Sequence, residues 1–135
     1  MANQIFVNLP VKDLNKTMDF FKSLGFSFNP QFTNDDAGCM VVSDSIYFMM
    51  VTEPFFKQFT GKPIANAFSS TETINVLSFN SRDEVDELLA KAVAAGAKEP
   101  RDPQDYGWMY NRAFEDPDGH LWEFMYADIT QAPQM

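Results

Sequence analysis

The side chain best placed to do chemistry in this sequence is the carboxylate of Glu123. It stands between Trp122 and Phe124, in an apolar stretch that predicts a β-strand. A carboxylate that faces an apolar interior needs a cationic partner or takes a raised pKa. If Glu123 faces a cavity, it could act as a general base, hold a cation or anchor a polar ligand.

Arg112 is the predicted partner of Glu123. The sequence Asp-Pro-Asp-Gly at residues 116–119 predicts a tight turn, and the hairpin register drawn from it places Arg112 directly opposite Glu123 on one face. The same face would carry further ligand-binding candidates, which are Tyr110, Phe114, Leu121 and Met125. Either Arg112 supplies the positive charge of a catalytic or binding pocket, or the two residues form a structural pair, or a bulge breaks the register.

Two other residues carry reactive groups, and each has a structural interpretation. His120 precedes Glu123 by three positions, a spacing that turns the two side chains to opposite faces of a strand. We therefore interpret His120 as a solvent-exposed or turn-stabilising residue in preference to a metal ligand. Cys39 is the single cysteine, and its apolar neighbours favour a buried structural thiol over a nucleophile.

Composition and charge narrow the class of partner. The net charge is −9 and no block of Lys and Arg occurs, which argues against nucleic acid or an anionic membrane. The sequence has no phosphate loop, dinucleotide-binding glycine motif, paired-cysteine zinc site or Ser/His/Asp set. A lone cysteine forms no internal disulfide, and no apolar stretch reaches the length of a membrane span. We expect a cytoplasmic globular protein with a small-molecule partner.

The apolar pattern predicts one strand, one helix and three strands, and then the same order again. In the first half, the predicted strands are 4–9, 26–32, 39–42 and 46–51, and the helix is 13–24. In the second half, strands are predicted at 73–79, within 97–106, at 108–115 and at 121–126, and the helix runs from a capping box at Ser81 to Gly96. Two halves, about 3–53 and 72–127, joined by the linker 54–71, would form one domain with a cleft between curved sheets and helices outside.

Three segments of the sequence resemble one family. They are residues 7–14 (VNLPVKDL) with the helix end at 20–26 (FFKSLGF), the second helix end at 92–97 (AVAAGA), and residues 114–124 (FEDPDGHLWEF). Together they are similar to the vicinal-oxygen-chelate superfamily of glyoxalase I, fosfomycin-resistance enzymes, bleomycin-binding proteins and extradiol dioxygenases. The resemblance spans residues 4–126 and implies an α+β fold of paired βαβββ modules, which form a curved mixed sheet around a central cleft.

The resemblance also implies a divalent-metal site, whose ligand positions can be compared one by one. Metal-dependent members use His, Gln or Glu side chains on the first and last strands of each half. The corresponding positions here fall on Phe6 and Ile74, and the strand at 46–51 holds no acid or imidazole. Only Glu123 matches, and one carboxylate is too few for a catalytic Zn²⁺, Ni²⁺, Fe²⁺ or Mn²⁺. We therefore expect no cofactor, with a divalent metal as the less favoured alternative.

The first strand and the linker add further candidates. Asn8 lies on the same face as Phe6, so both are candidate ligand-binding residues. The Asn8 amide either orients a ligand carbonyl or hydroxyl or bonds the neighbouring backbone. The linker carries Phe55, Phe56 and Phe59, which either pack in the core or cover a cleft or a partner subunit.

Two functions compete on these grounds. The first is a metal-free small-molecule-binding protein, similar in logic to a sequestration or resistance protein. The second is an enzyme, either a glyoxalase-I-like lyase (lactoylglutathione lyase) or isomerase or a dioxygenase relative. In that case Glu123 would be the base, and Arg112 or a metal the electrophile. The resemblance also implies a homodimer, and a purely structural dimer module is a third interpretation. The identity of the ligand does not follow from the sequence.

Overall fold

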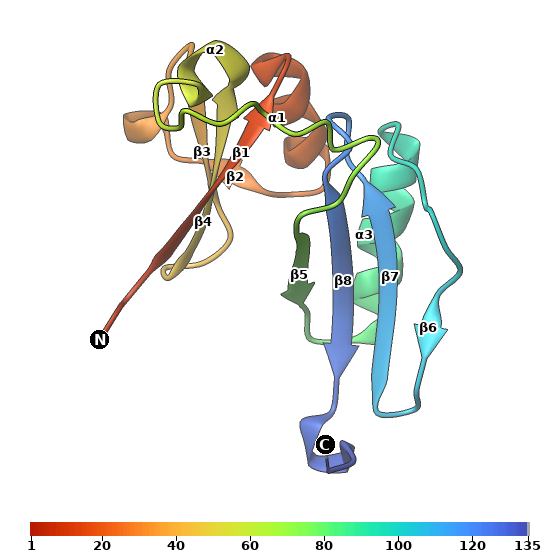
Figure 1. The fold of residues 1–135 in the computed structure, drawn as a ribbon. Coiled ribbons are helices and arrows are strands. Elements are labelled where there is room, and N and C mark those ends of the chain that lie inside the picture. Colours follow the sequence, from red (N-terminus) through yellow and green to blue (C-terminus); the bar gives the residue numbers. More distant parts are fainter. Residues whose placement is uncertain (135) are drawn as a thin grey trace. The chain divides into compact units, whose positions relative to one another are not determined.

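The computed structural model of this chain describes residues 1–134 and divides into two compact units, residues 1–66 and the chain from residue 67 onward. Each unit has one strand, one main helix and three further strands, in that order (Figure 1). Each unit forms its own four-stranded mixed sheet. The predicted α+β fold of paired βαβββ modules is confirmed.

The first unit is built on a sheet with the strand order β1-β4-β3-β2, in which β1 is parallel to β4 and the other neighbours are antiparallel. Its elements are β1 (Ile5–Val11), α1 (Leu14–Ser23), β2 (Ser27–Phe28), the 3-10 turn η1 (Pro30–Phe32), β3 (Ala37–Val41), β4 (Ile46–Thr52) and α2 (Glu53–Phe56). Helix α1 begins where the Asp13 carboxylate accepts a hydrogen bond from the Lys16 N–H. It ends at Leu24, before Gly25, whose φ of 102° favours glycine.

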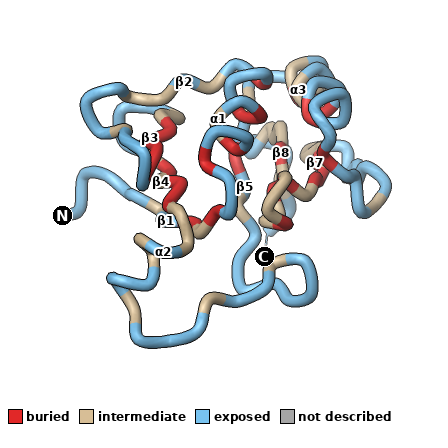
Figure 2. Tube along the Cα trace, turned by 90° about the horizontal axis from the view of Figure 1, so that it is seen from above, coloured by how far each residue is buried: buried red, intermediate tan, exposed pale blue. Residues whose placement is uncertain are grey.

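The core of the first unit lies between α1 and one face of this sheet. Leu9, Val11, Phe21, Met40 and Met50 are all buried there. In Figure 2 the buried positions follow α1, β3 and β4, whereas the start of β1 is exposed. The alternation of buried and exposed residues along β1 therefore separates a helix-facing side from a side that α1 does not cover.

The predicted strand at 26–32 is shorter than expected. Only Ser27–Phe28 pairs with β3, and η1 follows directly. The Asn29 side chain accepts a hydrogen bond from the Gln31 N–H and so starts a turn. Pro30 has no N–H to donate to a strand ladder. These two local preferences outweigh the alternating pattern of phenylalanines that predicted a longer strand.

The second unit repeats the arrangement with the strand order β5-β8-β7-β6, in which β5 is parallel to β8. Its elements are β5 (Ile74–Ser78), α3 (Arg82–Ala94), β6 (Gln104–Asp105), β7 (Met109–Glu115), β8 (Leu121–Ala127) and the 3-10 turn η2 (Ile129–Gln131). The predicted cap of α3 is present, because the Ser81 hydroxyl accepts from the Glu84 N–H and the Glu84 carboxylate accepts from the Asn80 N–H. The helix ends at Ala95, before Gly96, whose φ is 103°.

Helix α3 packs against one face of the second sheet (Figure 1). Phe114, Trp122 and Phe124 are fully buried on that face, and Val85 and Leu89 of the helix are fully buried as well. The opposite face is not covered by α3. We call it the helix-free face, and strand pairing assigns to it the side chains of Ile74, Val76, Asn111, Ala113, Leu121, Glu123 and Met125.

Candidate functional site

The β7–β8 hairpin has a register one residue away from the predicted one. Glu123 lies opposite Ala113, and Arg112 lies opposite Phe124. The loop has three residues, because the Asp116 N–H donates to the carbonyl of His120 and Gly119 adopts a φ of 85°. A turn that ends in a left-handed glycine adds one residue to a two-residue loop. This extra residue turns Arg112 and Glu123 to opposite faces of the sheet.

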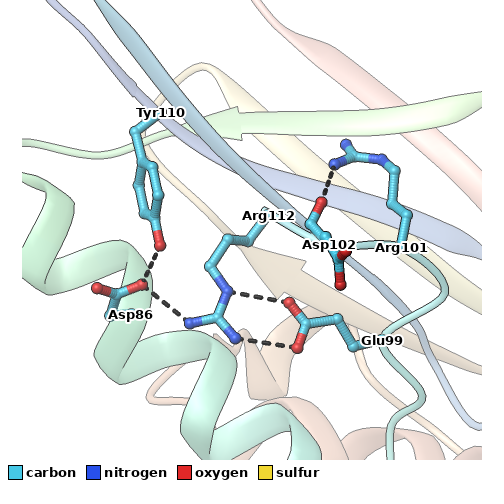
Figure 3. A network of polar contacts seen from close by, with 6 residues as sticks. All are labelled: Asp86, Glu99, Arg101, Asp102, Tyr110 and Arg112. Atoms are coloured by element: carbon cyan, nitrogen blue, oxygen red, sulfur yellow. Dashed lines mark hydrogen bonds and ion pairs between the residues drawn. The ribbon is translucent and has the colours of Figure 1, made fainter. Parts of the chain in front are cut away.

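The predicted pairing of Arg112 with Glu123 is therefore wrong. On the helix side of the sheet, the Arg112 guanidinium donates from Nε and Nη2 to the two carboxylate oxygens of Glu99, at 3.0 Å each. Its Nη1 donates to Asp86 of α3 at 2.9 Å, and the Tyr110 hydroxyl donates to the same Asp86 oxygen at 2.6 Å. Figure 3 shows this network, in which Arg112 joins the helix to the residues that follow it. Arg112 is held as a structural cation.

The same shift divides the predicted ligand-binding residues of the hairpin. Tyr110 and Phe114 alternate with Arg112 and belong to the helix side, so their predicted place beside Glu123 is wrong. Phe114 is fully buried in the core, where it stacks on Trp122. Leu121 and Met125 alternate with Glu123 along β8 and lie on the helix-free face with it.

Glu123 does have a cationic partner, but it is Arg101. The Arg101 Nη2 atom lies 3.1 Å from Oε2 of Glu123 and 2.6 Å from Oδ1 of Asn111. The Asn111 amide donates from Nδ2 to Oε1 of Glu123 at 2.7 Å. Each of these three side chains therefore contacts the other two, and we call them the Arg101 cluster. Within it the charges of Arg101 and Glu123 cancel.

The Arg101 cluster is partly withdrawn from solvent. Asn111 is 4% exposed, and the side chains of Glu123 and Arg101 are 18% and 28% exposed. Asn111 sits on β7 diagonally across from Glu123, within reach of a long side chain. Arg101 comes from the connection between α3 and β6, where no periodic pattern points to it. Gly119 is the sequence signal for Asn111. If this glycine is taken as the end of a three-residue loop, the hairpin register places Asn111 on the same face as Glu123.

Apolar side chains surround the cluster on the helix-free face. Val76 pairs with Glu123 across β5 and β8, and Ile74 pairs with Leu121. Both β5 residues are 47% exposed, which is a large fraction for aliphatic side chains on a strand. The face thus combines a neutralised ion pair with exposed apolar surface, two properties that organic ligand sites share.

The turn beside the hairpin holds a second buried carboxylate. Asp116 is 4% exposed and accepts hydrogen bonds from the backbone N–H groups of Asp118 and His120 and from Nε1 of Trp122. Burial raises the pKa of Asp116 to about 6. Of the two roles expected for His120, this geometry agrees with the turn role, because the backbone N–H of His120 closes the turn on Asp116.

The candidates of the first unit lie on the face that α1 does not cover. Phe6 is 51% exposed and stacks on Tyr47 with ring centroids 4.7 Å apart. Asn8 is exposed, and its amide donates to the carbonyl of Phe6 at 3.3 Å, which is the backbone-bonded alternative of the two expected. Cys39 is buried, and burial raises the pKa of its thiol, which suits a structural residue.

Comparison with known proteins now decides the family. Residues 3–124 match the sequence profile of the Glyoxalase/Bleomycin resistance protein/Dioxygenase superfamily. The chain belongs to this superfamily. No curated protein sequence matches the chain.

Solved structures of the superfamily fold are similar over nearly the full length. A hypothetical protein from S. aureus is 26% identical, with a TM-score of 0.79 over 94% of this chain and 95% of that one. The bleomycin resistance determinant encoded on the transposon Tn5 is 20% identical, with a TM-score of 0.64 over 93% and 98%. A genomically encoded fosfomycin resistance protein from Listeria monocytogenes is 19% identical, with a TM-score of 0.69 over 96% and 97%. At these identities the last two show a shared fold.

The metal-binding members of the superfamily hold a divalent cation, and the residues present here do not fit one. Within residues 1–134, no three His, Cys, Asp or Glu side chains gather into a cluster that could hold a metal ion. The Arg101 guanidinium lies against Glu123, and its positive charge opposes a second cation at that carboxylate. The donor set therefore disagrees with a metal centre. In the same part of the chain, no helix is long and apolar enough to cross a membrane.

Proposed function

We propose that this protein binds a small organic molecule on the helix-free face of its second sheet, as a sequestration or carrier protein of the superfamily. The Arg101 cluster is the observation that carries the proposal. Three polar side chains from a loop and two strands converge there, next to exposed Ile74 and Val76. Superfamily membership and the fold shared with drug-resistance proteins support a small-molecule partner.

The cluster suits binding because its geometry is fixed before a ligand arrives. Asn111 and Glu123 stand on paired strands, and Arg101 is held at the same time by both of them and by the carbonyl of Asp102. A polar group held in place loses little conformational freedom when a ligand binds. The apolar neighbours would supply most of the contact area, and the cluster would set the orientation of the ligand.

Proton transfer is less well supported than binding. Oε1 of Glu123 accepts a hydrogen bond from the Asn111 amide, and Oε2 forms an ion pair with the Arg101 guanidinium. A general base needs a carboxylate oxygen directed at a substrate proton. An ion pair with a guanidinium stabilises the ionised carboxylate and so makes it a weaker base. The lyase and dioxygenase alternatives therefore have no observation in their favour at this carboxylate. The cytoplasmic location and the homodimer expected from the sequence remain part of this proposal.

A thermal-shift screen with two matched variants tests the proposal. The library would contain glutathione adducts of methylglyoxal, catechols and antibiotics, each added to the wild type, Arg101→Met and Arg82→Met. Arg82 is the control, because it also pairs with one carboxylate, Asp105, but on the helix side of the sheet. A ligand at ten times its Kd should stabilise the 135-residue chain by about 1.4 kcal/mol, or roughly 5 °C.

We expect hits to stabilise the wild type and Arg82→Met but not Arg101→Met. Compounds that raise the Tm of Arg101→Met as much as that of the wild type would place the binding site away from the Arg101 cluster. The metal content of the purified protein provides the second readout. One equivalent of Zn, Ni, Fe or Mn that is lost in Glu123→Gln would overturn the proposal in favour of an enzyme.

A further inference from the structure

We infer that the ligand meets the Arg101 cluster with an uncharged group that has a hydrogen-bond acceptor beside a donor, as in a carboxamide, a lactam or a urea. This inference rests on the proposed function, because it specifies the chemistry of the same site. It follows from the charges in the cluster and from the hydrogen-bonding capacity that its members retain.

The first step concerns charge. Nη2 of Arg101 lies 3.1 Å from Oε2 of Glu123, so the charges of the guanidinium and the carboxylate neutralise each other. An anionic ligand would have to compete with Glu123 for Arg101, and a cationic ligand would have to compete with Arg101 for Glu123. The arginine of the hairpin, Arg112, offers no help to an anion, because it is turned to the helix side and bound by Asp86 and Glu99. A neutral group disturbs neither partner.

The second step concerns hydrogen bonds. A guanidinium has five N–H donors. In Arg101, Nη2 contacts Asn111 and Glu123, and Nη1 donates once, to the carbonyl of Asp102. Nε and the second hydrogen of Nη1 have no acceptor among the described residues. They therefore remain available as donors to a ligand.

Glu123 provides the complementary acceptor. A carboxylate has about four lone-pair positions. The Glu123 oxygens accept one hydrogen bond from Asn111 and one contact from Arg101, so acceptor positions remain on the same side chain that Arg101 touches. Donors and acceptors thus lie side by side within one ion pair. An amide carries the matching acceptor and donor within three atoms of each other.

The third step concerns the rest of the ligand. Val76 is the cross-strand neighbour of Glu123, and Ile74 pairs with Leu121 next to it. Both aliphatic side chains are exposed, so a ligand with a flat or aliphatic apolar body attached to its amide could cover them. The inferred ligand class is therefore an apolar molecule with an amide-like end.

Three probes with the same ring separate the chemical classes. Benzamide is neutral, benzoate is anionic and benzamidinium is cationic, and all three present a phenyl ring. Ligands of this size bind with a Kd on the order of 1 mM, so titrations followed by protein NMR are suitable. The reporter is the side-chain amide of Asn111, which belongs to the cluster itself. We expect benzamide to bind the wild type at least about tenfold more tightly than either charged probe.

Charge variants of the cluster should invert this preference. Glu123→Gln leaves Arg101 uncompensated and should favour benzoate, whereas Arg101→Gln leaves Glu123 uncompensated and should favour benzamidinium. Arg82→Gln, on the helix side, should keep the preference of the wild type. A cluster with a purely structural role would lose stability in the first two variants without any exchange of preferred probe.

The wild-type ranking alone can refute the inference, even if the variants fail to fold. Preferential binding of benzoate or benzamidinium by the wild type would reject the amide class and leave the binding function in place. The same holds if all three probes fail while library hits still depend on Arg101. If the library also yields no such hit, both the inference and the proposed function are rejected.

Discussion

Replacing Arg112 by methionine should destabilise the protein without changing ligand binding. The side chain of Arg112 is 20% exposed and makes three charge-assisted hydrogen bonds, two to Glu99 and one to Asp86. Methionine retains much of the aliphatic stem but none of the donors. Both carboxylates would then lack their counter-charge and would face each other across the gap.

The magnitude follows from the exposure of the partners. A hydrogen bond to a charged group contributes about 1.5–3 kcal/mol when it is well buried. The Glu99 and Asp86 side chains are 25% and 48% exposed, so solvent screens much of this energy. We therefore expect Arg112→Met to lower the free energy of unfolding by about 2 kcal/mol in total, or roughly 7 °C in Tm for 135 residues.

Urea denaturation and the benzamide titration together check this prediction. Arg112→Lys is the matched variant, because it keeps the charge but lacks the planar pair of donors that matches the two oxygens of Glu99. Its stability should lie between those of the wild type and Arg112→Met. A loss below about 0.5 kcal/mol would show that the network is screened like a surface ion pair. Loss of benzamide binding in folded Arg112→Met would place Arg112 in the site after all and refute the assignment of faces.

Three further predictions concern the hairpin and the cluster. Because the pKa of Asp116 is raised to about 6 in the folded state, its contribution to stability is present below pH 4 and is lost as the pH rises through 6. The stability of the wild type relative to Asp116→Asn should therefore fall between pH 4 and pH 7 in urea titrations, and a flat difference would contradict the burial argument. Gly119→Ala should lower the free energy of unfolding by about 3 kcal/mol, because the residue has a positive φ and the added Cβ would lie 2.9 Å from Phe68. Gly107→Ala is the control with a positive φ alone and should lower it by about 1 kcal/mol. Equal losses of stability in thermal melts would show that Phe68 moves away from the new side chain. Asn111→Ala should cost about 2 kcal/mol in urea denaturation, because the side chain is buried and bonds both other members of the cluster; an unchanged midpoint would mean that water replaces it.

Much of the fold could be predicted because its signals are local and repeated. Apolar periodicity predicts the two long helices, α1 and α3, and Gly25 and Gly96 mark their ends in the conformation that glycine favours. The order of elements in the two halves then suggested the duplicated architecture. The strand predicted at 26–32 is too long, because Asn29 and Pro30 favour a turn there. Hydrophobic alternation carries no information about this preference.

The candidate site could be predicted only in part, because it depends on one residue of register. The sequence correctly predicts that the carboxylate of Glu123 needs a cationic partner, but the predicted register gives Arg112 as that partner, whereas the structure gives Arg101. Since side chains alternate along a strand, a loop of three residues in place of two exchanges Arg112 for Asn111 beside Glu123. Arg101 lies in an irregular connection, where no pattern fixes the direction of a side chain.

The parallel pairing of first and last strands has a consequence for synthesis on the ribosome. In the first unit, β1 can pair with β4 only after the ribosome has synthesised the chain to about residue 52. In the second unit, β5 can pair with β8 only after synthesis has reached residue 127. Chains fold from the N-terminal end as they are made, so the first unit can fold while the second is still incomplete. Until β8 is released, the aliphatic side chains of β5 have no neighbouring strand, and this interval is when the nascent protein is most exposed to chaperones and to aggregation.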